Sequence, residues 1–188
     1  EAKRIDTETR KANGERIRKA KVLPPISDDE VPFEIPEGWK WVRVDSLISE
    51  PRYGTSKKCD YKPGSTGVLR IPNVVRGHVD DSDLKFANFN ESELCQYHLK
   101  SGDMLAIRSN GSKSLVGRCA IISECDTKYV YAGYLIRLRP FVADSHYMSV
   151  CFNSSSVRSQ IEGKAKSTSG VNNVNAQEMR SLVISCPP

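Results

Sequence analysis

The segment with the most chemistry-bearing side chains is the loop at residues 108–120, which reads RSNGSKSLVGRCA. Apolar residues on both sides, such as Ile107 and Ile121, predict that it joins two strands. The loop combines basic, hydroxyl and amide groups with flexible glycines, but it holds no histidine, and the nearest carboxylate is Asp103. Donors without a general acid or base are suited to binding a polyanion such as nucleic acid. The alternative interpretation is an ordinary solvated hairpin turn.

A second loop of similar composition lies near the C-terminus, at residues 167–175, with the sequence STSGVNNVN. Lysine and arginine pair with guanine edges or phosphate, asparagine pairs with adenine edges, and glycine lets backbone N–H groups approach phosphate. We expect these loops to converge with two earlier segments into one positive concavity. The predicted DNA-binding residues are Arg52, Tyr53, Ser56, Lys57, Lys58, Arg70, Asn73, Arg76, Arg108, Ser109, Asn110, Gly111, Ser112, Lys113, Ser114, Ser169, Gly170, Asn172 and Asn173.

Some of these residues have an alternative, purely structural interpretation. Asn172, Asn173 and Asn175 could instead cap the helix that follows them. Arg70 could form an ion pair within the fold. For the rest, the alternative is a solvated loop side chain.

The chain has 188 residues and a formal net charge of +5, which is compatible with a nucleic-acid partner but does not require one. Residues 51–76 contain six basic side chains and one acidic one, whereas residues 78–93 contain five acidic side chains and one lysine. We expect the basic stretch to face DNA and the acidic stretch to face away from it. Replacing Lys57 or Lys58 should then weaken binding to all sequences, whereas replacing Asn110 or Lys113 should relax sequence preference.

Several other classes of protein are not indicated. No run of about 18 apolar residues predicts a membrane span, and the charged residues 1–21 lack the apolar centre of a signal peptide. The six cysteines form no CxxC pair and the three histidines are scattered, which predicts reduced, mostly structural cysteines, no metal site and a cytoplasmic protein. The sequence has no GxxxxGK[ST] loop, no GxGxxG fingerprint after a strand and no Asn/Asp-Pro-Pro-aromatic run.

Composition divides the chain into three parts. Residues 1–21 form a charged leader, either the end of a connecting helix or a disordered segment, residues 22–37 a proline-rich linker, and residues 38–188 the main domain. Strands are predicted in VLRIPNVV, DMLAIRS, LVGRCAIIS and YVYAGYLIRLRPFV, with Arg137 and Arg139 pointing outward. Two short helices over residues 145–162 follow, and a capping box of Asn175 and Glu178 opens a third. The fold class is therefore α+β, a twisted, mostly antiparallel sheet with short late helices.

Four segments, in this order and spacing, resemble the DNA specificity (S) subunit of type I restriction–modification systems, in particular one target recognition domain. They are VPFEIPEGWKWVRVDSLI (31–48), GVLRIPNVVRGHVD (67–80), LKSGDMLAIRSNGSKSLVGRCAII (99–122) and STSGVNNVNAQEMRSLVISCPP (167–188). The resemblance covers about residues 32–188, and the leader is similar to the family's run out of a connecting helix. An intact S subunit usually has two recognition domains. One domain implies either a fragment of such a subunit or a half subunit that dimerises.

The resemblance implies that the domain at residues 38–188 reads one half of a bipartite DNA site without doing chemistry itself. Methyl transfer to adenine would belong to modification subunits that carry S-adenosylmethionine. Translocation and cleavage would belong to restriction subunits that use ATP and Mg. The implied partners are double-stranded DNA and these subunits, with no membrane and no cofactor in this chain.

Two functions of other classes are alternatives to DNA recognition. Asp126-Thr127-Lys128 matches the (D/E)xK element of metal-dependent nucleases, with Asp103 upstream as a further carboxylate. Magnesium-dependent cleavage lost on Asp126→Ala would support that reading. The charged leader could instead serve a protein-interaction module, which would bind a protein partner without salt-sensitive affinity for DNA.

Overall fold

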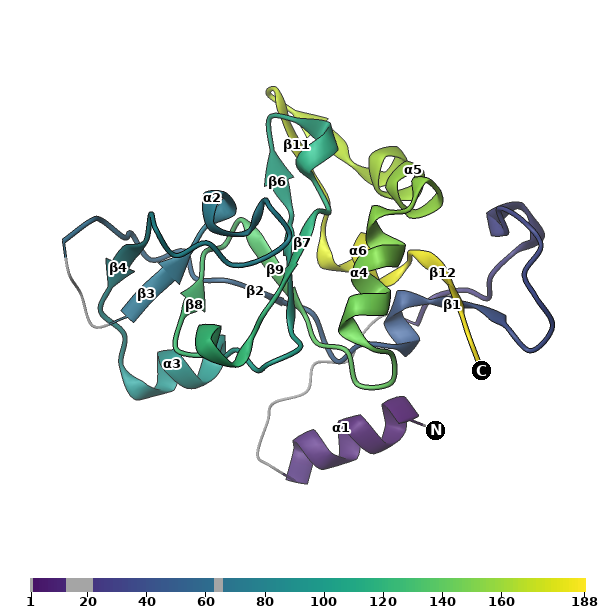
Figure 1. The fold of residues 1–188 in the computed structure, drawn as a ribbon, viewed down its shortest axis with the longest axis horizontal. Helices are drawn as coiled ribbons and strands as arrows, with labels where there is room; N and C mark the ends of the chain where they lie inside the picture. Colours follow the sequence, from purple (N-terminus) through teal and green to yellow (C-terminus); the bar gives the residue numbers. More distant parts are fainter. Residues whose placement is uncertain (1, 13–21, 63–65) are drawn as a thin grey trace.

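The computed structural model describes residues 2–12, 22–62 and 66–188, and it shows a mixed α+β chain (Figure 1). The helices are α1 (Ala2–Ala12), α2 (Ile71–Val74), α3 (Glu91–Tyr97), α4 (Ser145–Asn153), α5 (Ser155–Lys164) and α6 (Ala176–Arg180). The strands are β1 (Lys40–Arg43), β2 (Arg52–Tyr53), β3 (Thr66–Leu69), β4 (Lys85–Ala87), β5 (Met104–Ile107), β6 (Ser109–Asn110), β7 (Cys119–Ile121), β8 (Val130–Tyr131), β9 (Leu135–Leu138), β10 (Lys166–Thr168), β11 (Val171–Asn173) and β12 (Val183–Cys186). Short 3-10 turns cover Asp28–Glu30, Val44–Ser46, Lys113–Leu115 and Glu124–Asp126.

These strands form four small sheets, in the orders β1-β12, β10-β11-β6, β2-β9-β5-β7 and β4-β3-β8. Between the named strands of the described residues, only β3 and β8 pair in parallel; the other pairings are antiparallel. The predicted α+β class with a mostly antiparallel arrangement is confirmed. Every described strand is only two to four residues long.

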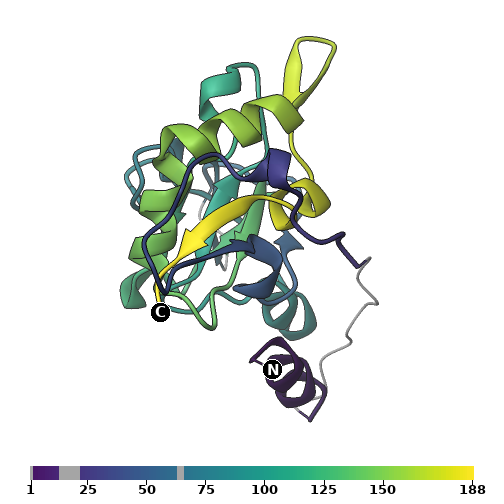
Figure 2. The same cartoon turned by 90° about the vertical axis from the view of Figure 1, so that its right-hand side faces the viewer.

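The centre of the molecule is the four-stranded sheet that contains β5, whose residues are all fully buried. Successive side chains of a strand point to opposite faces. Met104 therefore joins a core cluster with Phe152 and Ile161 of α4 and α5, whereas Leu105 joins a second cluster on the other face with Tyr131. Figure 2 looks onto the first face, where the green helices and the yellow β12 lie in front of the sheet. A sheet covered on both faces gives a rigid base for the loops at its ends.

The prediction that Arg137 points outward is wrong. Arg137 lies in β9, between β2 and β5, and is only 5% exposed because both faces of this sheet are covered. Its guanidinium donates a hydrogen bond to the backbone oxygen of His98 at 2.8 Å, and burial lowers its pKa from the usual value. The alternation of apolar residues and arginines at residues 135–140 (LIRLRP) is therefore not the pattern of a half-solvated strand.

The predicted strand VLRIPNVV ends early, because only Thr66–Leu69 pair as a strand and Ile71–Val74 form a helical turn. Pro72 lies in the first turn of α2, where its missing N–H costs nothing, whereas in a strand ladder it would remove a hydrogen bond. The stretch LVGRCAIIS also contains less strand than predicted. Gly117 turns the chain at a φ of +81° before β7 begins at Cys119.

The late helices agree with their sequence predictions. The two helices expected over residues 145–162 are α4 and α5, which meet at Ser154. The capping box predicted for Asn175 and Glu178 forms at the start of α6: each side chain accepts a hydrogen bond from the other residue's backbone N–H, at 2.9 and 2.7 Å. Asn175 is therefore a cap, as one of the alternative interpretations proposed.

The linker residues described from 22 onward are held to the body by Arg43 of β1. Its guanidinium pairs with Glu30 at 2.7 Å and also donates to the backbone oxygens of Pro24 and Pro25. In the leader, residues 2–12 are helical, and the rest of the segment predicted as a leader lies outside the described residues. None of the helices in the described parts of the chain has the length and apolar character needed to cross a membrane.

The Arg43–Glu30 pair predicts how stability responds to acid. The hydrogen bond from Arg43 lowers the pKa of Glu30 from 4.5 to about 2. Because the folded-state pKa lies below the unfolded one, the stabilisation is complete above pH 4.5 and is lost as the pH falls towards 2. We expect Glu30→Gln to lower the free energy of unfolding at pH 7 and to flatten its decline across this window, as measured by urea denaturation. Glu34→Gln, at an exposed linker position, is the matched control, and a Glu30→Gln curve parallel to wild type would contradict the assignment.

Candidate nucleic-acid interface

The two polar loops at residues 108–120 and 167–175 come together in one small sheet. β6 pairs antiparallel with β11, with Asn110 opposite Asn172 and Ser109 opposite Asn173, and β11 pairs in turn with β10. Figure 1 shows this sheet projecting from the body above the central strands. We call it the polar ribbon, formed by residues 109–110 and 166–173. The predicted convergence of these two loops is confirmed, although they form a projection and not a concavity.

The outer part of the polar ribbon is a tight hairpin that packs against little else. Ser169 and Gly170 join β10 to β11 with φ angles of +49° and +78°. Positive φ at both central residues matches a hairpin turn whose twist fits the flanking strands. Residues 166–171 are all exposed, and a Cβ added at Gly170 would meet no atom within 4 Å. A twisted two-stranded ribbon of this kind has the width that the major groove of B-DNA admits.

The amide side chains of the ribbon are partly used to hold the loop. Asn172 Nδ2 donates to the backbone oxygen of Gly111 at 3.0 Å, and Asn110 Oδ1 accepts from the backbone N–H of Ser112 at 2.8 Å. Ser112 Oγ lies 3.0 Å from Ser114 Oγ, and Asn173 Nδ2 donates to the backbone oxygen of Val171 at 3.2 Å. These contacts leave Asn110 Nδ2 and Asn172 Oδ1 without a partner among the described residues. A donor and an acceptor therefore lie side by side on paired strands.

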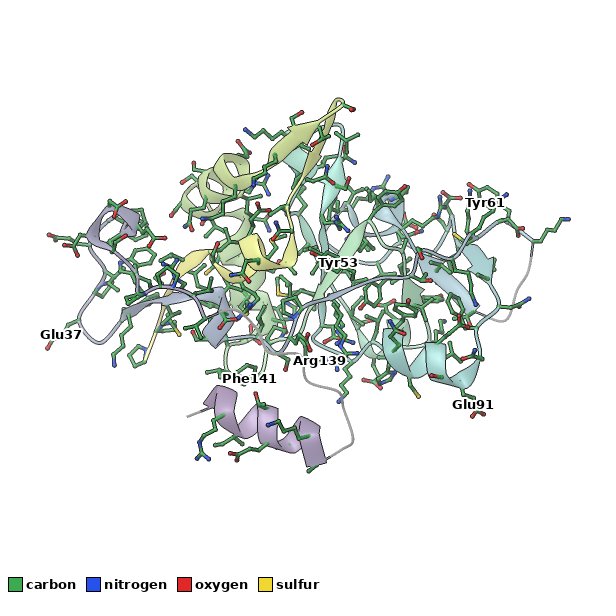
Figure 3. The ribbon with its side chains drawn as sticks, turned by 180° about the vertical axis from the view of Figure 1, so that it is seen from behind. Glu37, Tyr53, Tyr61, Glu91, Arg139 and Phe141 are labelled. Carbon is green, nitrogen blue, oxygen red and sulfur yellow. The ribbon has the colours of Figure 1, made fainter. Side chains whose placement is uncertain are left out.

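Tyr53 connects the base of the ribbon to the body. Its hydroxyl accepts a hydrogen bond from the backbone N–H of Ala176 at 2.9 Å, and its ring lies 4.6 Å below the guanidinium carbon of Arg108. Figure 3 shows Tyr53 at the centre of the back face, below the ribbon. The preceding residue, Arg52, pairs with Arg137 in the central sheet. Of the predicted residues in the first segment, Tyr53 is thus the one placed beside the two loops.

Other predicted residues have structural partners that occupy their polar groups. Asn73 is 1% exposed; its oxygen accepts from the backbone N–H of Arg70, and its amide donates to the backbone oxygens of Asp80 and Asp83. Arg70 pairs with Asp83 at 2.9 Å, as its alternative interpretation proposed. Lys57 pairs with Glu93 at 2.8 Å and lies over the ring of Phe89. Asn73 is not part of the interface, because burial keeps its amide from the surface.

The expectation that the basic and acidic stretches face opposite ways is wrong. Lys57, Arg70 and Arg76 of the basic stretch each form an ion pair with a carboxylate of the acidic stretch. The two stretches are adjacent because β3 and β4 pair antiparallel with Gly67 opposite Phe86. Three of the six basic side chains at residues 51–76 are therefore compensated by carboxylates within the domain. Ser56 and Lys58 remain exposed between β2 and β3.

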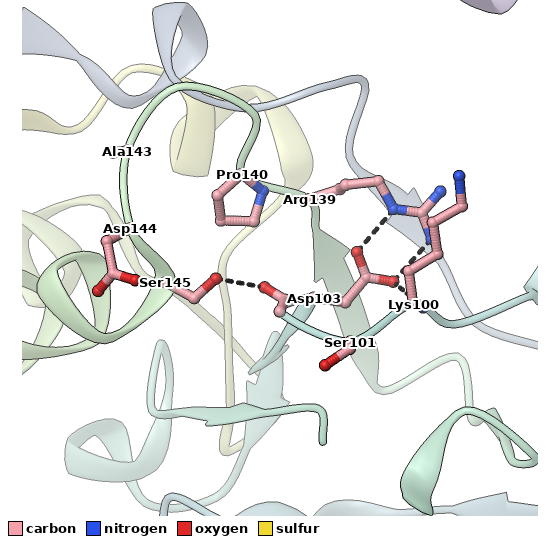
Figure 4. Close-up of a pocket in the computed structure, with 9 residues that line it drawn as sticks. Lys100, Ser101, Asp103, Arg139, Pro140, Ala143, Asp144 and Ser145 are labelled. Atoms are coloured by element: carbon pink, nitrogen blue, oxygen red, sulfur yellow. Dashed lines mark hydrogen bonds and ion pairs between the residues drawn. The ribbon is translucent and has the colours of Figure 1, made fainter. Parts of the chain in front are cut away.

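Two hollows lie away from the polar ribbon. One, of about 300 Å³, is lined by residues that include Lys100, Asp103, Arg139 and Ser145 (Figure 4). The other, of about 750 Å³, lies between the linker at residues 29–33 and the exposed side of α5. Neither hollow is lined by a residue of the polar ribbon or by a predicted DNA-binding residue.

The carboxylates of the nuclease alternative are engaged in structural contacts. Asp103 is 1% exposed and accepts hydrogen bonds from Arg139 at 2.7 Å through both oxygens (Figure 4). Asp126 accepts from the backbone N–H and the hydroxyl of Ser123, at 2.9 and 2.5 Å, at the start of a 3-10 turn. In the described ranges, no three His, Cys, Asp or Glu side chains gather where they could bind a metal ion. This geometry gives a metal-dependent nuclease no support.

Comparison with known proteins agrees with the resemblance found in the sequence. No family model matches the chain. The chain is 30% identical over 180 residues to the specificity subunit of the type I restriction enzyme EcoEI from Escherichia coli, a match that covers 92% of this chain and 30% of the relative. It is 33% identical over 153 residues to the EcoKI specificity subunit of Escherichia coli strain K12, covering 80% of this chain and 33% of that protein. The chain is related to type I specificity subunits.

The solved structures extend this relationship to the fold. A chain from a study of type I R-M complex assembly and conformational transition matches with a TM-score of 0.60 at 15% identity, covering 84% of this chain and 36% of its own length. The HsdS subunit of Thermoanaerobacter tengcongensis matches with a TM-score of 0.56 at 15% identity, over 85% of this chain and 40% of that one. The α+β arrangement is that of S subunits. This chain spans about a third of the length of the specificity subunits it matches.

Two features of the interface were not predicted from the sequence of this chain. One is the stacking of Arg108 on Tyr53, which joins residues from separate segments. The other is Tyr134, which is 63% exposed and accepts a hydrogen bond from the backbone N–H of Arg108 through its backbone oxygen. The position of Tyr134 directly after Gly133, in a turn between two buried strands, is the pattern that could have indicated it.

The buried Asp103–Arg139 pair predicts a large loss of stability on mutation. We expect Asp103→Ala to lower the free energy of unfolding by about 3 kcal/mol, because removal of one partner leaves the other charge uncompensated in a partly buried site. The control is Glu8→Ala, which breaks an exposed pair with Arg4 and should cost no more than about 0.5 kcal/mol. Chemical denaturation measures both values. Equal losses for the two variants would contradict a structural role for Asp103.

The hairpin turn predicts a local effect at Gly170. A Cβ fits in the open space there, but the φ of +78° strains any side chain, so Gly170→Ala should speed hydrogen exchange across residues 166–173. Gly163→Ala is the matched control, because that glycine also has open space but lies in helix α5, where alanine should stabilise by up to about 1 kcal/mol. If Gly170→Ala left exchange in the hairpin unchanged, the turn geometry described above would be incorrect.

Proposed function

We propose that this chain is a DNA target recognition domain of a type I restriction–modification system and that it reads one half of a bipartite site. The observation that carries the proposal is the polar ribbon, in which two loops far apart in sequence pair to present amide, hydroxyl and basic groups on one projection. The relationship to type I specificity subunits supports the same function. The other half of the site would be read by a second domain, either in the same subunit or in a second copy.

In the mechanism that follows from this geometry, the hairpin of β10 and β11 enters the major groove. Side-chain amides on the ribbon would pair with base edges, since asparagine offers the donor and acceptor that adenine requires. Exposed lysines such as Lys113 and Lys166 would contact phosphate or guanine at the edges of the ribbon. The covered central sheet would keep these groups in a fixed arrangement, so that little ordering is needed when DNA binds.

The chemistry of the system would lie in partner subunits. We infer that the chain itself is non-catalytic and carries no cofactor. Modification subunits with S-adenosylmethionine would methylate adenine, and restriction subunits with ATP and Mg would cleave DNA, in the cytoplasm. The recognition domain would determine where these subunits act by holding them at one DNA sequence. Magnesium-dependent cleavage by the chain alone, lost on Asp126→Ala, would contradict this division.

The proposal predicts a sequence-selective loss of binding from the ribbon. Asn110→Ala and Asn172→Ala should each relax the preference for one or two base pairs, by about 1–3 kcal/mol per lost base contact, because each removes a neutral group that reads a base. Neither should change the slope of affinity against salt, since that slope counts phosphate contacts. Competition binding with duplexes selected from a random library measures both quantities.

The matched control is Asn153→Ala, an exposed asparagine at the end of α4 whose amide bonds the backbone oxygen of Ser149. It should leave preference and affinity unchanged. If the wild-type chain bound no duplex in a salt-sensitive way, or if Asn110→Ala and Asn172→Ala behaved like this control, the proposed role of the ribbon would be rejected. For the full subunit with its methyltransferase, mapping of methylated adenines in cellular DNA would identify the bipartite site.

A further inference from the structure

Arg108 differs from most of the other arginines that lie partly inside the domain. Five of those form an ion pair with a carboxylate: Arg43 with Glu30, Arg70 with Asp83, Arg139 with Asp103, Arg158 with Glu162, and Arg180 with Asp45. Arg137 has no such pair among the described residues, but its guanidinium donates a hydrogen bond to the backbone oxygen of His98. Arg108 has no carboxylate and no hydrogen-bond acceptor for its guanidinium among the residues that the structure describes, and its Nε is buried. Its one side-chain contact of note is the ring of Tyr53. The positive charge at the base of the ribbon is therefore uncompensated.

The backbone of Arg108 is fixed at the junction between the body and the ribbon. Its N–H donates to the backbone oxygen of Tyr134 at 2.9 Å, and its carbonyl accepts from the N–H of Val174 at 2.8 Å. The residue lies directly after β5, whose side chains are fully buried, and directly before β6. Arg108 thus stands where two rigid elements meet, and its side chain begins from a constrained position.

Tyr53, whose ring lies under the guanidinium of Arg108, is itself held in three ways. It pairs with Ile136 in the central sheet, and its hydroxyl accepts from the N–H of Ala176 at 2.9 Å. The next residue, Gly54, packs so closely that a Cβ there would lie 2.2 Å from the backbone oxygen of Tyr131. A ring fixed in this manner limits the positions open to the guanidinium that lies over it. Tyr53 is still 40% exposed, so the stack reaches the surface of the domain.

We propose that Arg108 is a specificity-determining residue that reads the edge of a guanine at the base of the ribbon, with Tyr53 as its positioning residue. This inference rests on the proposed function. Guanine presents two acceptors, O6 and N7, in the major groove, and a planar guanidinium can donate to both at once. Stacking on an aromatic ring limits rotation of the guanidinium, which favours a directional bidentate contact over a flexible contact with phosphate. The amides of the ribbon then contact nucleobases, and Arg108, where the ribbon meets the body, contacts a guanine.

The test uses the full chain of 188 residues and a library of randomised DNA duplexes, followed by binding measurements on the selected sequence. Arg108→Lys should weaken discrimination at one guanine position by about 5-fold or more and keep the preferences at other positions, because an ammonium keeps the charge but lacks the planar fork of the guanidinium. Arg108→Gln should move the preference at that same position from guanine towards adenine, because a carboxamide matches the adenine edge. Tyr53→Leu should weaken the same guanine preference. A merely structural role for Arg108 would not shift preference from one base to another.

The matched control is Arg118→Lys, which alters an exposed arginine of the same loop whose Nε already bonds the backbone oxygen of Ser114. It should leave the selected sequence unchanged, and thermal unfolding of every variant checks that it is folded. If Arg108→Lys and Arg108→Gln keep the wild-type guanine preference, or weaken all duplexes equally as a phosphate contact would, the inference fails while the proposed function stands. If the wild-type chain selects no sequence at all, the proposed function fails and this inference with it.

Discussion

The antiparallel pairing of β6 with β11 is the interaction on which the candidate site depends. It joins the loop that follows β5 to the loop that precedes α6, and it places Asn110 opposite Asn172. Without it, the hairpin of β10 and β11 would have no lateral support, because a two-stranded hairpin alone is marginally stable in water. The pairing also carries the order of the central sheet outward, since β6 follows β5 after a single residue. In this way the buried sheet limits the movement of the exposed side chains of the polar ribbon.

Much of this could be predicted from the sequence where the determinants are local. The two late helices, the capping box at Asn175 and the strand at β5 follow from short patterns of apolar spacing and capping residues, and they form as predicted. The similar composition of the two polar loops also indicated that they act together. Composition could show that the loops were alike, but the ribbon that they form depends on a strand register set by the folded chain.

The predictions that failed concern contacts between distant segments. Whether Arg137 points outward depends on whether a second layer covers its face of the sheet, and a strand pattern alone does not contain that information. The basic stretch at residues 51–76 was expected to face DNA because charges were counted along the chain. In the fold, the pairing of β3 with β4 brings the acidic stretch alongside, and ion pairs such as Arg70–Asp83 compensate the charge. The uncompensated Arg108 is visible only after these pairs have been identified.

The exposure of the hairpin at residues 166–171 has an evolutionary consequence. These side chains bury almost no apolar surface, so their replacement removes little of the energy that folds the body. Apart from the turn at Ser169 and Gly170, such a segment can diversify while the scaffold beneath it stays constant, in the manner of an antibody loop on its framework. New target sequences could then arise by exchange of a few codons, with no need for the rest of the domain to adapt.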